Sequence, residues 1–359
     1  MPIETTAGVA PVTIHPLAAR RILRFAFGTA LSLAFSQAAN WPMGFIAPVF
    51  TALILSLPLP PPKLRQGIMF VVALLAPMAV GVLMLPFMHH ARWAGILLVT
   101  VSLYYSFYYT AKGGSPVMGT FMTVGLTVIV TIGSVNIDVI FLLVQSLGLG
   151  AVSGLAFVWI AHALMPDPPP DPALAIAKPA PPPPPLLAEA RSNARRALLI
   201  VLPVALLFMY MSGSPAYTVV MIKVASMGQQ ATSDHSRTMG RSLLASTVWG
   251  GIGAVIGWNL LNVWPSLLIY TLFIGLAGLV YGRGFFRGPD LHPNYSMWSY
   301  AFITLIVILG PSVTAGEGGT GAGAAFWTRL SLFAIIAVYG STAVAVYDAF
   351  AGRSKKATD

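Results

Sequence analysis

The chain contains two copies of one hydrophobic pattern, and this duplication is the feature that most limits how it can fold. Ala19-Arg20-Arg21 begins an apolar run, and Ala194-Arg195-Arg196 begins another. Further along, the stretch Ala76-Pro77-Met78-Ala79-Val80-Gly81 is matched by Ile252-Gly253-Ala254-Val255-Ile256-Gly257, so the spacing between matches stays near 175 residues. Many membrane transporters are built from internal repeats, with the substrate held where the two halves meet.

The composition requires a membrane. Hydrophobic residues make up 57% of the chain, charged residues only 8%, and the mean hydropathy is +0.79. A water-soluble core could not hide so much apolar surface, so a bilayer must solvate it. The net charge of +10 comes from basic residues in short gaps between apolar runs, which orients a membrane protein and predicts no nucleic-acid partner. Cysteine is absent, which excludes disulfides and Cys-based metal sites.

Twelve apolar runs are long enough to span the bilayer, six in each half. Because backbone polar groups must be satisfied within lipid, these runs predict helices. The expected fold is an all-α integral membrane protein with about 12 transmembrane helices arranged as two parallel six-helix repeats. The predicted spans are 21–38, 42–58, 67–87, 93–111, 116–134, 139–164, 195–212, 215–229, 243–263, 266–282, 297–313 and 327–349.

The placement of lysine and arginine predicts the orientation. With the N-terminus inside, 17 of the 20 basic residues fall in cytoplasmic gaps or tails, whereas Arg92 and Arg329 fall outside and Lys223 lies within a span. This asymmetry predicts that both termini are cytoplasmic. The expected organisation is a disordered N-terminus (1–18), a first repeat (19–165), a Pro-rich cytoplasmic linker (166–190), a second repeat (191–350) and a cytoplasmic tail (351–359).

Lys223 is the most unusual residue of the predicted spans. It lies about six residues above the cytoplasmic end of its run, which places it ~9 Å into the hydrocarbon. A lysine at that depth costs ~2.5–3.5 kcal/mol unless it finds a polar partner. Its side chain either snorkels to the cytoplasmic headgroups or binds an anion in a central cavity. Gln229, at the end of the same run, is a second candidate for substrate binding.

The symmetry-related run, 42–58, carries Pro48 near its middle. A proline there kinks or breaks a helix. Interrupted helices at matching positions of two repeats indicate a binding site, although an ordinary kink is the alternative.

Two further groups are candidates for cargo contact and gating. Tyr104, Tyr105 and Tyr108 form either an interfacial aromatic belt or a stacking wall for an aromatic cargo. The polar stretch after Lys223 forms either a solvated loop or an inner gate and proton relay. The gate and proton-coupling candidates are Asp234, His235, Arg237 and Arg241.

The scattered histidines and acids do not converge at spacings that hold a metal or support catalysis, so we expect no enzyme, no metal and no cofactor.

With these elements the chain resembles the fusaric acid resistance and aromatic acid exporter superfamily. The resembling elements are Arg20-Arg21 before the first run, Trp41-Pro42 followed by Ala47-Pro48, the basic turn from Lys63 to Arg65, and the repeat of the unit from Arg195. The resemblance implies export of aromatic or other organic acids, together with a periplasmic adaptor protein and an outer-membrane duct. Larger members carry a cytoplasmic domain between the halves, where this chain has only the linker.

The expected function is therefore a bacterial inner-membrane transporter that exports small organic, aromatic acids. The proton gradient or the membrane potential would drive it, in contact with membrane lipids and in a possible homo-oligomer. One alternative is a membrane platform that assembles an efflux complex without a cargo site of its own. The other is a channel or lipid-handling protein.

Overall fold

The computed structural model describes residues 15–133, 137–167, 186–210, 224, 227–228, 236–287, 290–314 and 321–356. Within these ranges it contains eleven helices and one antiparallel pair of two-residue strands. The strands β1 (Phe286–Arg287) and β2 (Asp290–Leu291) join α10 to α11. The helices are α1 (Pro16–Ala38), α2 (Ile46–Leu55), α3 (Leu64–His90), α4 (Arg92–Ala111), α5 (Pro116–Gly133), α6 (Ile137–Leu164), α7 (Leu187–Tyr210), α9 (Ser236–Val263), α10 (Leu267–Gly282), α11 (Tyr295–Thr314) and α12 (Gly321–Lys356).

The protein is a multi-pass, all-α membrane protein. Six helices (α3, α4, α6, α9, α11 and α12) contain segments long and apolar enough to cross a bilayer, and three shorter helices (α2, α5 and α10) are apolar too. Large apolar side chains point outward, as at Leu83 and Phe141, each 72% exposed. Such a surface would associate in water, but lipid chains solvate it in a membrane.

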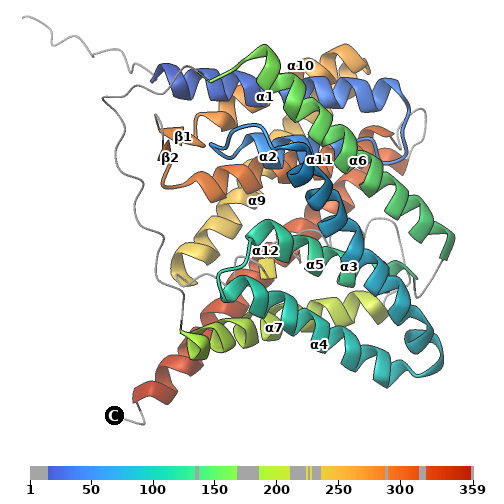
Figure 1. Ribbon diagram of the computed structural model, residues 1–359, viewed down its shortest axis with the longest axis vertical. Helices are drawn as coiled ribbons and strands as arrows, with labels where there is room; N and C mark the ends of the chain where they lie inside the picture. The colour runs from blue at the N-terminus through green and yellow to red at the C-terminus, as the bar shows by residue number, and fades with distance from the viewer. Residues whose placement is uncertain are drawn as a thin grey trace, which may run out of the picture.

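Several helices pack closely along one another in pairs. α3 packs along α5, and α9 packs along α11. α1 packs along α10, and α7 packs along α4, so helices far apart in the sequence lie side by side. Figure 1 shows the α1–α10 pair at one edge of the molecule and the α4–α7 pair at the opposite edge. α11 is deeply buried, and Phe302, Leu305 and Leu309 have no exposed surface.

The ends of several helices lie on the same side of the molecule. In Figure 1 the N-terminal ends of α1 and α7 and the C-terminal ends of α6 and α12 all lie toward the left. α7 begins at Leu187, inside the segment that the sequence assigns to the linker.

Glycines allow the helices to approach closely. A Cβ added to Gly125 of α5 would lie 2.9 Å from the backbone nitrogen of Met78, and one added to Gly81 would lie 2.8 Å from the carbonyl oxygen of Gly125. In the second half, a Cβ at Gly250 would lie 2.5 Å from the carbonyl oxygen of Ala301. Small residues at helix contacts are typical of membrane proteins, where close packing replaces the hydrophobic effect between helices.

Pro48 does not lie in the middle of a helix, which corrects the predicted kink. α2 begins at Ile46, so Pro48 is the third residue of its first turn and is buried. N–H groups of a first turn have no partner within the helix, and a proline, which has no N–H, is therefore tolerated there. The chain before α2 is a turn in which Asn40 and Met43 have φ of 50° and 52°.

We expect Gly125→Ala to destabilise the protein by about 1–3 kcal/mol, because the new methyl group meets backbone that cannot move aside. Gly148→Ala on α6 is the matched control, since its Cβ would lie 3.7 Å from the end of the Leu75 side chain. Thermal unfolding in detergent, followed by tryptophan fluorescence, measures both. Equal melting temperatures for the two variants would contradict the close α3–α5 contact.

Candidate functional site

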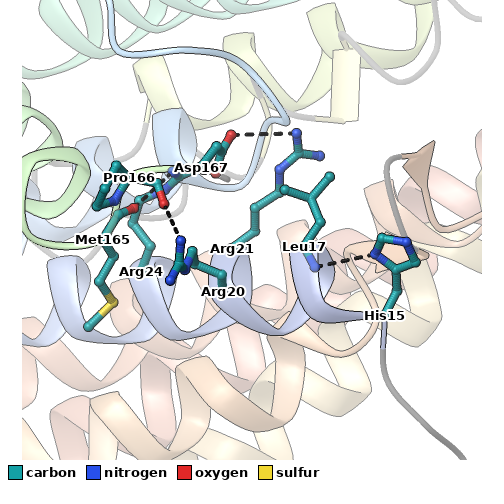
Figure 2. Close-up of polar contacts among 8 residues, drawn as sticks. All are labelled: His15, Leu17, Arg20, Arg21, Arg24, Met165, Pro166 and Asp167. Carbon is teal, nitrogen blue, oxygen red and sulfur yellow. Dashed lines mark hydrogen bonds and ion pairs between the residues drawn. The ribbon is translucent and has the colours of Figure 1, made fainter. Parts of the chain in front are cut away.

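The described residues that combine charge, burial and specific contacts lie where the start of α1 meets the end of α6. α1 begins with Pro16 at its first position, and the ring of His15 accepts a hydrogen bond of 3.2 Å from the N–H of Leu17. Arg20, Arg21 and Arg24 follow at a spacing that places them on one side of the helix. Figure 2 shows the three side chains reaching toward the segment that follows α6.

Arg24 and Asp167 form the central contact of this cluster. Nη1 of Arg24 lies 2.7 Å from Oδ1 of Asp167 and 3.3 Å from the carbonyl oxygen of Met165. The Arg24 side chain is 2% exposed, whereas that of Asp167 is 31% exposed. A short, charge-assisted bond of this kind is about twice as strong as a neutral hydrogen bond.

Arg21 and Arg20 extend the contact to both sides. Nη2 of Arg21 lies 3.6 Å from Oδ2 of Asp167, and its guanidinium lies 5.9 Å from the centre of the Phe286 ring. Nη1 of Arg20 donates a 3.0 Å hydrogen bond to the carbonyl oxygen of Pro166. Three guanidinium groups thus contact the segment that directly follows α6, close to the helix end whose dipole favours cations. We call Arg20, Arg21, Arg24 and the segment 165–167 the α1–α6 clasp.

A buried polar layer lies deeper between α1, α2 and α6. Oγ1 of Thr51 lies 3.0 Å from Oγ of Ser32, 3.0 Å from the carbonyl oxygen of Ala47 and 3.3 Å from that of Gly154. Thr51 and Ser32 have no exposed surface. These bonds fix how the three helices meet below the clasp.

Another buried arginine lies on α12. Nη1 of Arg329 donates a 2.9 Å hydrogen bond to Oγ of Ser312 on α11, and the residue is 8% exposed. The sequence places Arg329 in an outer gap, but the structure buries it within the helix bundle. Arg21 and Arg24, expected in a cytoplasmic gap, are likewise buried residues of α1.

Buried charge in the described part of the chain is positive. Arg21, Arg24, Arg196 and Arg329 are buried, whereas the acidic residues whose exposure the structure describes, Asp167, Glu189 and Asp290, are exposed. The same residues contain no group of three histidine, aspartate or glutamate side chains placed to hold a metal ion.

The residues singled out from the sequence are spread over several helices. Lys223, Gln229, Asp234 and His235 lie outside the described residues. Arg237 belongs to the first turn of α9, and Arg241 is an exposed residue of the same helix.

The tyrosines lie on α4. The rings of Tyr104 and Tyr108 are half-buried and parallel, with centroids 6.1 Å apart, whereas Tyr105 is 60% exposed. α4 packs along α7 and α5, whereas α2, which carries Pro48, packs along α6 and α1. Pro48 and the tyrosines therefore lie on helices that pack against different neighbours.

The clasp was missed because Asp167 was taken as part of the linker and the arginines as orientation signals. One signal was present: three arginines on one helix face, and a single acid directly after the last span of the same repeat.

The fold defines the class as an all-α multi-pass membrane protein. Residues 21–162, from the start of the clasp to the last turn of α6, match the sequence profile of a family described as "Protein of unknown function (DUF2955)". No curated protein and no solved structure matches the chain.

We expect Asp167→Asn to destabilise the protein by about 1–3 kcal/mol, because it leaves the buried Arg24 without its counter-charge. The figure is below that for a fully buried pair because the Asp167 side chain is 31% exposed. Asp290→Asn, at an exposed position in β2, is the matched control. A melting temperature for Asp167→Asn equal to that of the control would rule out a stabilising clasp.

Proposed function

We propose that the protein exports small organic anions across the bacterial inner membrane, with aromatic carboxylic acids as the first class to test. The observation that carries the proposal is the positive charge buried among its helices, at Arg24, Arg21, Arg196 and Arg329. Buried cations are expensive in a membrane and mark ion and substrate pathways. A positive interior favours an anion over a cation or a neutral lipid.

The membrane potential favours this direction of transport. Moving one negative charge outward across an inside-negative membrane releases ~2.3 kcal/mol per 100 mV. Coupling to protons would need a titrating group, for which Asp234 and His235 are the candidates, with Arg237 and Arg241 at an inner gate.

The proposed architecture is two parallel six-helix repeats, with 12 spans and both termini in the cytoplasm. Two observations support it. The α3–α5 and α9–α11 pairs occupy matching places in the two halves, as do the α1–α10 and α7–α4 pairs. In addition, Arg20 and Arg195 are exposed while Arg21 and Arg196 are buried, so the duplicated motif is used alike in both halves.

In this proposal Lys223 neutralises the carboxylate of the cargo, and Tyr104, Tyr105 and Tyr108 stack against its ring. Pro48 and Gln229 complete the candidate contacts. The resemblance to the aromatic acid exporter superfamily adds a periplasmic adaptor, an outer-membrane duct and a homo-oligomer as proposed partners.

We expect cells that express the protein to show saturable efflux of at least one radiolabelled aromatic acid, and we expect Lys223→Ala to abolish it. Lys112→Ala is the matched control, because Lys112 is the exposed residue that caps the end of α4. Membrane abundance of each variant is measured alongside efflux.

Two outcomes would contradict parts of the proposal. Normal efflux by Lys223→Ala would remove Lys223 from the site. Absence of efflux for every acid, with or without a co-expressed adaptor, would favour the membrane platform, which should also tolerate leucine at position 223.

A further inference from the structure

We propose that Arg21 and Arg24 form a binding site for a small monocarboxylate, and that Asp167 fills this site in the conformation described here. An incoming carboxylate takes the place of the Asp167 side chain and releases the segment 165–167 from α1. That the ligand is also the cargo rests on the proposed function; the binding site does not.

The geometry is that of a carboxylate site with unused capacity. One carboxylate serves two guanidinium groups, at 2.7 Å from Arg24 and at 3.6 Å from Arg21. Nε of Arg24 has no hydrogen-bond partner among the described residues. A ligand that is not tied to the chain could use two parallel donors of Arg24, the arrangement that arginine favours with carboxylates.

The burial of the two partners differs in the direction that exchange requires. The guanidinium of Arg24 is inside the protein, whereas almost a third of the Asp167 side chain is accessible. A buried arginine that loses its counter-charge is destabilised. Release of Asp167 is therefore favoured when another anion takes its place, which couples release of the segment to ligand binding.

The position of Asp167 in the chain makes its release possible. α6 ends at Leu164, and Asp167 lies in the non-helical segment that follows. Its movement therefore leaves the hydrogen bonds of α6 intact, except those of the last turn. Among the described residues, the other hydrogen bonds of the segment run from Arg20 to Pro166, from Arg24 to Met165, and from the N–H of Met165 to the carbonyl oxygen of Ala161.

The surroundings favour a carboxylate that carries an apolar ring. The Phe286 ring lies 5.9 Å from the guanidinium of Arg21, and Phe286 is buried beside Phe285. Benzoate is therefore the probe, and chloride at the same ionic strength is the control anion.

The first experiment is rescue of Asp167→Asn by benzoate in purified, detergent-solubilised full-length protein. We expect benzoate to raise the melting temperature of this variant saturably and well above the effect of chloride, since it restores the missing carboxylate. Asp290→Asn should gain no more than the wild type. A benzoate shift for Asp167→Asn no larger than that for Asp290→Asn would overturn the proposal.

The second experiment leaves Asp167 in place, so it does not depend on a destabilised variant. The chain has no cysteine, and Met165→Cys therefore introduces a single thiol, at a half-buried position within the segment. We expect benzoate to accelerate its alkylation several-fold and saturably. Ala163→Cys, on the exposed surface of α6, should show no change.

An alkylation rate of Met165→Cys that does not respond to benzoate would show that the segment is not displaced, and would overturn the exchange. Neither experiment measures transport. Absence of aromatic acid efflux with a positive rescue would thus reject the proposed cargo and keep the binding site.

Discussion

The structure depends on the close approach of helices in lipid, a solvent in which the hydrophobic effect does not drive helices together. Lipid chains are as apolar as the side chains on the helices, so association depends on packing and on a few polar contacts. The glycines of the α3–α5 and α9–α11 crossings provide this packing, since backbone lies where a side chain would otherwise be. The polar layer around Thr51 then adds direction, because its hydrogen bonds are satisfied in one arrangement of α1, α2 and α6.

The buried arginines impose a second requirement on the same packed helices. Each guanidinium inside the bundle needs an acceptor, and Arg24 and Arg329 have different ones. Arg24 has a carboxylate and a carbonyl, whereas the contact shown for Arg329 is a serine hydroxyl.

Much of the fold could be predicted from the sequence. The length of an apolar run can be read from composition, so the predicted run 93–111 coincides closely with α4. In contrast, α7 begins well before the predicted run 195–212, and α12 extends beyond 327–349 at both ends. Pro48 was misplaced because an apolar run does not show where a helix begins inside it. Turn residues such as Asn40 and Met43, with positive φ, are part of the same apolar-looking stretch.

The site was harder to predict because its residues serve two purposes. Basic residues next to a span orient the protein in the bilayer, and this statistical role concealed the specific contacts of Arg21 and Arg24. Asp167 belongs to a segment whose composition is that of a linker, and only the three-dimensional end of α6 brings it to α1. Helical spacing gives the face of α1 that carries charge, but not the chain segment that meets it.

The packing of α1 along α10, two helices far apart in the sequence, also affects how the protein can be assembled. α1 packs along α10, and Gly278 of α10 fits against Ala26 of α1. During synthesis α1 leaves the ribosome long before α10 exists, so the face that will be buried has to wait in lipid or against an insertion factor. The first half therefore cannot reach its final packing on its own, and final assembly is delayed until the chain has been made almost to its end.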